Sequence, residues 1–307
     1  MSKRGDFKHW FNDECDEYRR HSIALNDRYP KLFEERSPYQ QVEICNSLEF
    51  GGMLVLDGSP QSAERDERIY HESLVHPAGI LLGEPPKDIL ILGGGEGATA
   101  REALRYKSAR KIITVDIDRV VVDVSRRLLA AMREGVDKDE RSRFITADAK
   151  EFLVAPEKFS IMTPYDYDLI FSDINDSQSK VDEDAAARCY APEFFEHVAK
   201  RLRGIFVMQS QELSRVVWRN HKKHRETLKQ FFKQVYSYRR YVPSFNYEQS
   251  FILASNAGIS DPRILQPQIV DYLIRDRISG ELEEYSGDMH AHLFALSPYL
   301  KQKLEIT

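Results

Sequence analysis

The chain of 307 residues is 42% hydrophobic and 30% charged, and its formal net charge at pH 7 is −5. This length suffices for one large domain or two modest ones with a full core. The slightly acidic charge gives no electrostatic reason to expect a nucleic acid or an anionic membrane as partner.

The spacing of Cys15, Cys45 and Cys189 matches neither a metal site nor a disulfide framework, which indicates a reducing compartment. The chain begins with charged residues and contains no run of eighteen apolar residues. We therefore expect no signal peptide and no membrane span, and a cytoplasmic location.

Residues 1–80 are predicted to form a small N-terminal domain of strands and hairpins. Segments such as residues 41–44 and 53–56 follow the two-residue period of strands in places, and the second segment stops at the turn signal Asp57-Gly58. The domain is therefore expected to be mostly β.

From about residue 85 onward, short apolar strands alternate with helices. The expected strands are 88–92, 111–116, 143–146, 167–172, 204–208 and 251–254, and the main expected helices are 98–106, 120–132 and 192–202. Such alternation implies a parallel sheet covered by helices on both faces. We therefore predict that residues 81–307 form a doubly wound, Rossmann-like α/β domain.

A glycine-rich turn, which includes Gly93 and Gly95, lies where the first of these strands meets a helix. Glycine allows the backbone to turn sharply and to approach a ligand, and the start of the helix offers unpaired N–H groups. The turn therefore predicts a nucleotide-like cofactor. Its pattern also fits the dinucleotide fingerprint of a dehydrogenase.

Three acidic positions refine this cofactor hypothesis. Asp116, at the end of the second strand, suits the two hydroxyls of a ribose, and Asp148-Ala149, after the third strand, suits an adenine amino group. Glu96 lies inside the glycine turn, where a carboxylate would repel a pyrophosphate and attract a positively charged cofactor. Glu96 therefore favours a sheet of the S-adenosylmethionine-methyltransferase type over a dehydrogenase.

Asp173 and Asp176 follow directly after the strand-like run of residues 167–172. Carboxylates at the carboxyl edge of a parallel sheet face whatever lies over the cofactor. Two negative groups there suit a cationic substrate, and one of them can take a proton from an amine.

Several segments beside the glycine turn form a specific set of motifs. They are Ser37-Pro38-Tyr39-Gln40, Asp57-Gly58-Ser59-Pro60-Gln61, Tyr70-His71-Glu72 and Asp173-Ile174-Asn175-Asp176. Together they resemble the polyamine aminopropyltransferases, a family that includes the spermidine, spermine and thermospermine synthases. The resemblance covers nearly the whole chain. The segment 93–102, with the segment 70–77 before it, most resembles the thermospermine synthases, whereas spermidine synthases usually have Asp in place of Glu96.

The resemblance implies transfer of an aminopropyl group from decarboxylated S-adenosylmethionine to an amine, with release of methylthioadenosine. Decarboxylated S-adenosylmethionine is then a co-substrate, and displacement at a carbon next to a sulfonium needs neither a metal nor a prosthetic group. Glu96 and Asp173 would favour the donor's ammonium and disfavour the carboxylate of ordinary S-adenosylmethionine.

The resemblance also implies roles for individual residues. Asp173, helped by Tyr70, would accept the proton of the attacking amine or orient that amine. Asp176 would hold the substrate ammonium, and His71 would either contact the acceptor or position its loop. The donor would be held by Gln40, Gln61, Gly93, Gly95, Glu96, Asp116, Asp148 and Ala149.

Three departures from the family pattern bear on the acceptor. The acidic triplet 182–184 replaces a segment that is usually rich in glycine and proline. Phe245 lacks the usual hydroxyl, and nearby Glu248 is a candidate partner for a distal amine. The segment Gln209-Ser210-Gln211-Glu212 corresponds to the family's Gln-Gly-Glu, but its alignment is ambiguous, so the residue that takes the acidic role stays open. We therefore favour spermidine or another triamine as acceptor, with a thermospermine- or spermine-type product.

Alternatives stay open at this point. The chain is also compatible with a spermidine synthase that uses putrescine, with an S-adenosylmethionine-dependent methyltransferase, and with a non-catalytic polyamine-binding relative. By the same resemblance, the N-terminal β domain is expected to pair with its counterpart in a homodimer or homotetramer.

Overall fold

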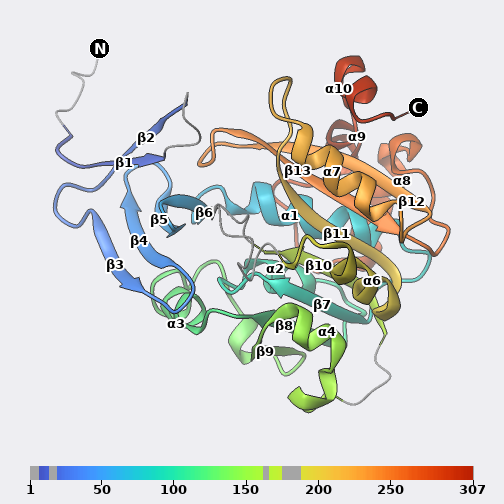
Figure 1. Cartoon of the computed structure of the whole chain (residues 1–307), viewed down its shortest axis with the longest axis horizontal. Coiled ribbons are helices and arrows are strands. Elements are labelled where there is room, and N and C mark those ends of the chain that lie inside the picture. Colours follow the sequence, from blue (N-terminus) through green and yellow to red (C-terminus); the bar gives the residue numbers. More distant parts are fainter. Residues whose placement is uncertain (1–6, 14–18, 162–165, 175–187, 307) are drawn as a thin grey trace.

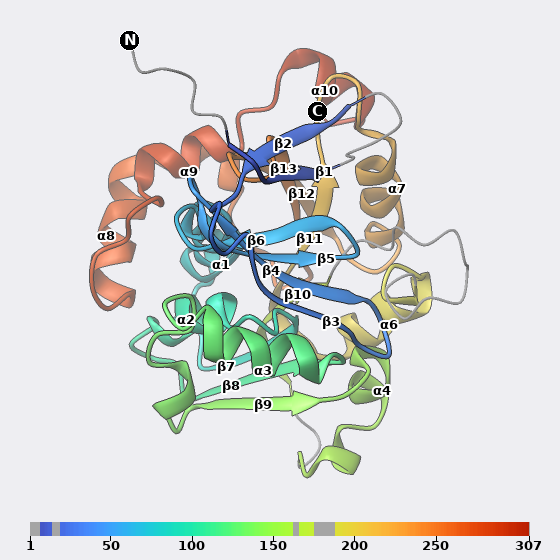
Figure 2. The same cartoon turned by 90° about the vertical axis from the view of Figure 1, so that its left-hand side faces the viewer.

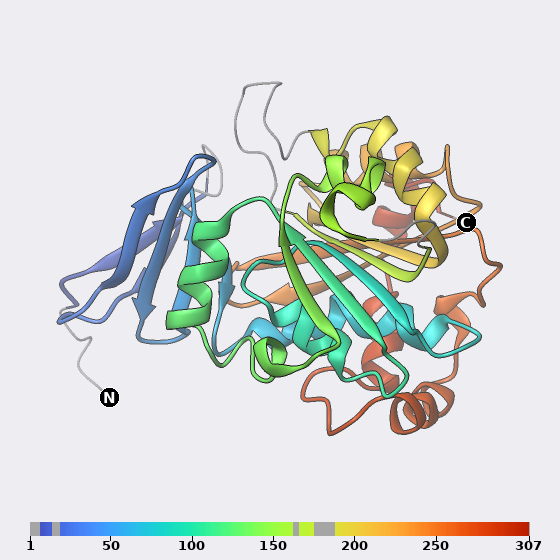
Figure 3. The same ribbon diagram turned by 90° about the horizontal axis from the view of Figure 1, so that it is seen from below.

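The computed structural model describes residues 7–13, 19–161, 166–174 and 188–306. Figures 1 and 3 show a group of N-terminal strands set against one side of a larger α/β body. No helix in these four ranges is both long and apolar enough to cross a membrane.

The N-terminal strands form two antiparallel sheets. The smaller sheet pairs β1 (Trp10–Asp13) with β2 (His21–Ala24), and the larger has the order β3 (Lys31–Arg36), β4 (Gln41–Ser47), β5 (Gly51–Leu56) and β6 (Ser59–Ala63). Both β4 and β5 are buried on their two faces. Ile44 and Leu54 face one apolar cluster, while Cys45 and Met53 face another.

Helix α1 (Glu67–Leu81) is the largest departure from the mostly β character predicted for residues 1–80. Nearly all of its residues are buried, and it packs across the large sheet, where the Tyr238 hydroxyl donates a 3.0 Å hydrogen bond to the carbonyl of Ser73. A helix buried all round lacks a clear polar face, so its sequence carries little helical periodicity. The domain boundary predicted at residue 80 stays a prediction.

The large sheet contains seven strands in the order β12-β13-β11-β10-β7-β8-β9. Their bounds are β7 (Asp88–Gly93), β8 (Lys111–Asp116), β9 (Ser142–Thr146), β10 (Tyr167–Asp173), β11 (Leu202–Glu212), β12 (Gln234–Val242) and β13 (Tyr247–Ser255). The five strands from β11 to β9 are parallel, as the alternating pattern predicted. In contrast, β13 is antiparallel to both β11 and β12. The short turn that joins β12 to β13 requires the antiparallel pairing of these two strands.

Helices cover both faces of this sheet, which confirms the predicted Rossmann-like architecture (Figure 2). The described helices that follow α1 are α2 (Ala98–Leu104), α3 (Arg119–Leu128), α4 (Ala149–Val154), α6 (Pro192–Arg201), α7 (Arg219–Leu228), α8 (Pro267–Arg277), α9 (Gly287–Leu293) and α10 (Pro298–Lys303). Alternate strand residues separate the two cores. Ile89 and Ile91 face α1 and α2, whereas Leu90 and Leu92 face the side of α4 and α6.

Helix α3 joins the two parts of the molecule. Its Val121 and Val124 pack against Val42 and Ile44 of the N-terminal sheet, and Figure 3 shows the helix lying along that sheet. Because α3 follows directly after β8, this packing brings the N-terminal strands over the carboxyl ends of the parallel strands. A cavity is enclosed between them.

Candidate active site

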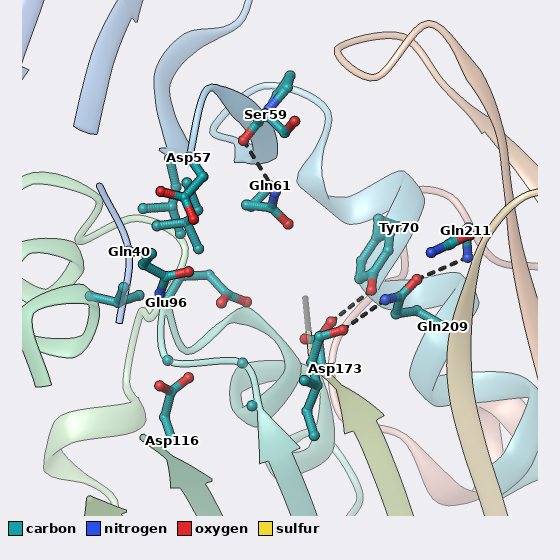
Figure 4. A pocket seen from close by; sticks show the side chains of 18 of the residues that line it. Gln40, Asp57, Ser59, Gln61, Tyr70, Glu96, Asp116, Asp173, Gln209 and Gln211 are labelled. Carbon is teal, nitrogen blue, oxygen red and sulfur yellow. Dashed lines mark hydrogen bonds between the residues drawn. The ribbon is translucent and has the colours of Figure 1, made fainter. Parts of the chain in front are cut away.

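A cavity of about 560 Å³ lies at the carboxyl ends of β7, β8 and β10 (Figure 4). Its walls come from the N-terminal strands, from α1, and from the ends of β11 and β13. Ligands of open α/β sheets bind in this position, where the loops after parallel strands separate.

The glycine turn brings the backbone close to its neighbours. Gly93 has φ of +82°, and a Cβ placed on it would lie 2.2 Å from the carbonyl oxygen of Asp173. A Cβ on Gly95 would lie 2.7 Å from Oδ2 of Asp116. A side chain at position 93 would therefore push β7 away from β10, and a side chain at position 95 would fill the space beside Asp116.

Asp173, the last residue of β10, is held at the centre of the cavity. Its backbone pairs with Gly93, and its carbonyl accepts a 3.1 Å hydrogen bond from the N–H of Gly94. Its carboxylate accepts one hydrogen bond on each oxygen, both of 2.6 Å, from the hydroxyls of Tyr70 and Thr99. Burial and the nearby charge of Glu96 raise the pKa of Asp173, although these two hydrogen bonds act in the opposite direction.

His71 lies between two carboxylates. Its Nδ1 is 2.9 Å from Oε2 of Glu67, and its Nε2 is 3.1 Å from Oε1 of Glu96. Burial alone would lower the pKa of His71, but the two carboxylates outweigh it and raise that pKa to about 10. The imidazolium therefore carries a positive charge at neutral pH and fixes the Glu96 carboxylate toward the cavity.

Glu67 is in turn held by Arg101 of α2, whose guanidinium forms two hydrogen bonds of 2.8 Å with its carboxylate. A bidentate pair of this kind sets orientation as well as charge. The buried row from Arg101 through Glu67 and His71 to Glu96 thus connects helices α1 and α2 with the glycine turn.

The residues predicted to hold the cofactor all line one end of this cavity: Gln40, Gln61, Gly93, Gly95, Glu96, Asp116, Asp148 and Ala149.

Asp116 accepts a 2.8 Å hydrogen bond from the N–H of Asp118. Burial, together with the charges of Glu96 and Asp118, raises the pKa of Asp116 to about 7. The loss of water around this carboxylate is costly until a ligand donates hydrogen bonds to it.

Two of these predicted residues are partly committed elsewhere in the protein. The Gln40 amide donates a 2.9 Å hydrogen bond to Asp118. The Asp148 carboxylate caps α4 by accepting from the N–H groups of Lys150 and Glu151, and its Oδ2 pairs with Arg188 at 2.9 Å. Each carboxylate oxygen still has a lone pair, so these contacts leave Asp148 able to accept a further hydrogen bond.

The opposite end of the cavity is lined by residues from β11 and from the β12–β13 hairpin: Gln209, Gln211, Glu212, Phe245, Tyr247 and Gln249. Gln211 adopts a left-handed backbone with φ of +57°, and both Gln211 and Glu212 line the cavity, so each stays a candidate for the contact with the acceptor. Arg19 also lies there, with its guanidinium 2.8 Å from Oε2 of Glu212.

The suggestion that Glu248 meets a distal amine is wrong. Tyr247 and Gln249 line the cavity and Glu248 does not. Successive side chains of β13 point to opposite faces of the sheet, so a residue between two cavity-lining neighbours faces away. Asp176 and the acidic triplet 182–184 lie outside the described residues.

The described lining of the cavity carries seven carboxylates against two basic residues, Arg19 and His71. The carboxylates belong to Asp13, Asp57, Glu96, Asp116, Asp148, Asp173 and Glu212. Such a surplus of negative charge in an enclosed site attracts cations and raises the free energy of a bound anion. The lining of the cavity therefore favours positively charged ligands.

His71, Glu96 and Asp173 each place a potential metal-ligand atom within 4.8 Å of the others. A metal ion needs a ring nitrogen with a free lone pair. Both nitrogens of His71 are instead hydrogen-bonded to carboxylates that favour the protonated ring. The donor set therefore fits a proton better than a metal ion.

Several residues of the site escaped the sequence analysis. Thr99 and Arg101 lie in the expected helix after the glycine turn, and Glu67 lies just before Tyr70-His71-Glu72, but nothing in their spacing shows that they meet Asp173 and His71. Arg19 had no sequence signal.

Two family models match the chain. One, described as the spermine/spermidine synthase domain, matches residues 67–260, and the other, described as the spermidine synthase tetramerisation domain, matches residues 9–64.

Curated relatives match over most of their length. A polyamine aminopropyltransferase from Sulfolobus acidocaldarius is 37% identical over 282 residues, which cover 89% of this chain and 87% of the relative. A polyamine aminopropyltransferase from Saccharolobus solfataricus is 33% identical over 305 residues, which cover 97% and 93%.

Two solved structures share the fold. The crystal structure of a spermidine synthase in complex with the transition-state analogue AdoDATO has a TM-score of 0.84 at 23% identity, with 98% of this chain and 96% of that chain covered. The spermidine synthase from Thermotoga maritima has a TM-score of 0.81 at 23% identity, with 100% and 98% covered.

Proposed function

Because the chain belongs to the spermine/spermidine synthase family, we propose that it transfers the aminopropyl group of decarboxylated S-adenosylmethionine to a polyamine amine. The observation that carries the proposal is the carboxylate of Asp173 held by Tyr70 and Thr99 in a cavity whose lining favours cations. Both reactants of this transfer are cations.

The donor occupies the end of the cavity near β7 and β8. Asp116 accepts hydrogen bonds from the two ribose hydroxyls, and Asp148 and Ala149 lie beside the adenine. Glu96, fixed by His71, faces the positively charged aminopropyl-sulfonium part. The carboxylate of ordinary S-adenosylmethionine would be repelled by the same groups, which disfavours the methyltransferase alternative.

An alkylammonium has a pKa of about 10.4, so it is protonated at neutral pH and has no lone pair. The acceptor amine must therefore lose a proton before it attacks. Asp173 lies at the junction of the two halves of the cavity and takes that proton. The amine nitrogen then forms a bond to the aminopropyl carbon while the carbon–sulfur bond breaks, and its electrons neutralise the sulfonium. Methylthioadenosine leaves as a neutral thioether.

The acceptor is proposed to be spermidine or another triamine rather than putrescine. Phe245 presents an apolar ring next to Tyr70, with a centroid distance of 6.0 Å, where a hydroxyl would suit the far ammonium of a short diamine. Farther along the cavity, Gln209, Gln211 and Glu212 supply oxygen acceptors for a more distant ammonium.

The protein is further proposed to be a homo-oligomer, a dimer or a tetramer, that assembles through its N-terminal strands. Trp10, Tyr29 and Leu32 expose between 44% and 55% of their surface there. Light scattering during size-exclusion chromatography tests this proposal.

Incubation with decarboxylated S-adenosylmethionine and a panel of di-, tri- and tetraamines tests the activity and the acceptor together. Chromatography must separate spermine from thermospermine, because these isomers differ only in which end of spermidine attacks. Methylthioadenosine release with spermidine and weak release with putrescine is the expected result. Release with putrescine alone would refute the triamine acceptor, and no release with any amine would refute the transferase.

A further inference from the structure

A second cavity, of about 190 Å³, lies between α7, β12 and the C-terminal segment, and it shares no lining residue with the catalytic cavity. Four basic side chains line it, those of Arg225, Lys229, Arg263 and Lys301. The carboxylate among its described lining residues is Glu305, which pairs with Lys222.

Arg225, on α7, is the central residue of this cavity. Only 7% of the residue is exposed, whereas Lys229, Arg263 and Lys301 are exposed. Its Nη1 donates to the carbonyl of Val235 at 2.6 Å and to the hydroxyl of Ser237 at 3.3 Å. Its buried Nε has no hydrogen-bond partner, and within the described ranges the guanidinium forms no ion pair.

Burial, helped by the neighbouring charge of Arg263, lowers the pKa of Arg225 to about 10. Arg263 is paired with Asp261 at 2.7 Å, so the charge left without compensation is chiefly that of Arg225. Lys229 and Lys301 add two more cations at the rim. A buried cation without a counter-charge is unfavourable, and an anion in the cavity would relieve that cost.

We propose that this cavity is a binding site for a small oxyanion of the phosphate type. Its volume corresponds to about six water molecules, which suits a tetrahedral anion with some hydration. A guanidinium fork binds such oxygens in a planar, two-point manner, and the ammonium groups of lysines add point charges. The aromatic rings of Tyr236 and Phe294 also line the cavity, so the phosphoryl group of a small phosphomonoester is one source and free phosphate is the other.

Isothermal titration of the full chain with inorganic phosphate and, separately, with phenyl phosphate tests the site. Chloride keeps the ionic strength constant, and saturating methylthioadenosine fills the catalytic cavity so that anion binding there does not contribute. Saturable binding of one anion per chain is expected, together with a rise in the melting temperature. Tighter binding of phenyl phosphate would identify a phosphomonoester as the source, and equal or weaker binding would identify free phosphate.

Arg225→Gln should weaken anion binding by about tenfold or more, because it removes a charge-assisted hydrogen-bond donor. The double variant Lys229→Gln/Lys301→Gln changes only rim residues, so it gives the same test if Arg225→Gln fails to fold. Lys223→Gln, an exposed change on the same helix, is the matched control and should bind like the unchanged chain. No saturable binding, or equal binding by all variants, would overturn the proposal.

Discussion

The hydroxyl of Tyr70, on helix α1, donates a 2.6 Å hydrogen bond to Oδ1 of Asp173, at the carboxyl end of β10. The ring of Tyr70 is itself fixed by Phe245 and Phe251, with centroid distances of 6.0 and 5.3 Å. The carboxylate is therefore held in one orientation by a rigid aromatic residue, while its remaining lone pairs face the cavity.

Replacing the central carboxylate tests the proton transfer. Asp173→Asn should lower kcat by about 10²–10⁴-fold, because an amide cannot accept the proton of the attacking amine. The amide keeps the shape of the carboxylate, so the melting temperature should change little. Near-normal turnover in this variant, measured as methylthioadenosine release, would contradict the role of Asp173.

Removing the phenolic hydroxyl tests how Asp173 is tuned. The hydrogen bond from Tyr70 lowers the pKa of Asp173, so Tyr70→Phe should raise that pKa. The acid limb of the pH profile of kcat/KM should then move to higher pH, and kcat should fall by about tenfold to a hundredfold. Thr99→Val, which removes the other donor to the same carboxylate, should shift the limb in the same direction. An unmoved limb in both variants would show that Asp173 does not control it.

Asp116 links ligand binding to stability. Its pKa rises from 3.8 to about 7 on folding, so its contribution favours the folded state below pH 3.8 and is lost as the pH rises through about 7. Asp116→Asn should therefore raise the free energy of unfolding by about 1–3 kcal/mol at pH 8 and leave it nearly unchanged at pH 3.5. The same variant should raise the KM for the donor. Urea unfolding at the two pH values checks the first effect, and a variant less stable at pH 8 would contradict it.

The ring at position 245 is expected to influence acceptor choice. Phe245→Tyr adds a hydroxyl that can accept a hydrogen bond from the far ammonium of a diamine. The ratio of kcat/KM for putrescine to that for spermidine should increase by about tenfold. An unchanged ratio, with a normal KM for the donor, would remove Phe245 from the proposed determinants of acceptor length.

We expect a buried histidine, His221, to help position Gln211 from outside the cavity. His221 bridges the hydroxyls of Ser237 and Ser250 at 2.9 and 2.8 Å, and the hydroxyl of Ser250 is shared between the carbonyl oxygens of Ser210 and Gln211, at 2.6 and 2.8 Å. Burial lowers the pKa of His221 to about 3, so it acts as a neutral ring.

His221→Ala should therefore raise the KM for the acceptor more than the KM for the donor, and it should lower the free energy of unfolding by about 2 kcal/mol. His221→Gln retains a donor and an acceptor and should restore part of the acceptor KM. Equal changes in both KM values would indicate general loosening of the structure rather than positioning of Gln211.

The fold of the catalytic domain could be predicted well because its signals are local. The runs at residues 88–92 and 111–116 became β7 and β8 almost residue for residue, since short apolar stretches bounded by turn residues suit buried parallel strands. Helix α1 and strand β12 were missed. The first is buried all round, and the second gains its place mainly by pairing with β13.

By itself, the sequence determined that a glycine turn, Glu96, Asp116 and Asp173 follow the ends of parallel strands, because strand ends and tight turns depend on residues close together in the chain. Only the tertiary structure decided which groups these carboxylates meet. Tyr70 and Asp173 are 103 residues apart, and His71 reaches Glu96 only because α1 packs across the sheet. Such contacts depend on how helices and strands pack together, and the spacing of residues along the chain does not encode them.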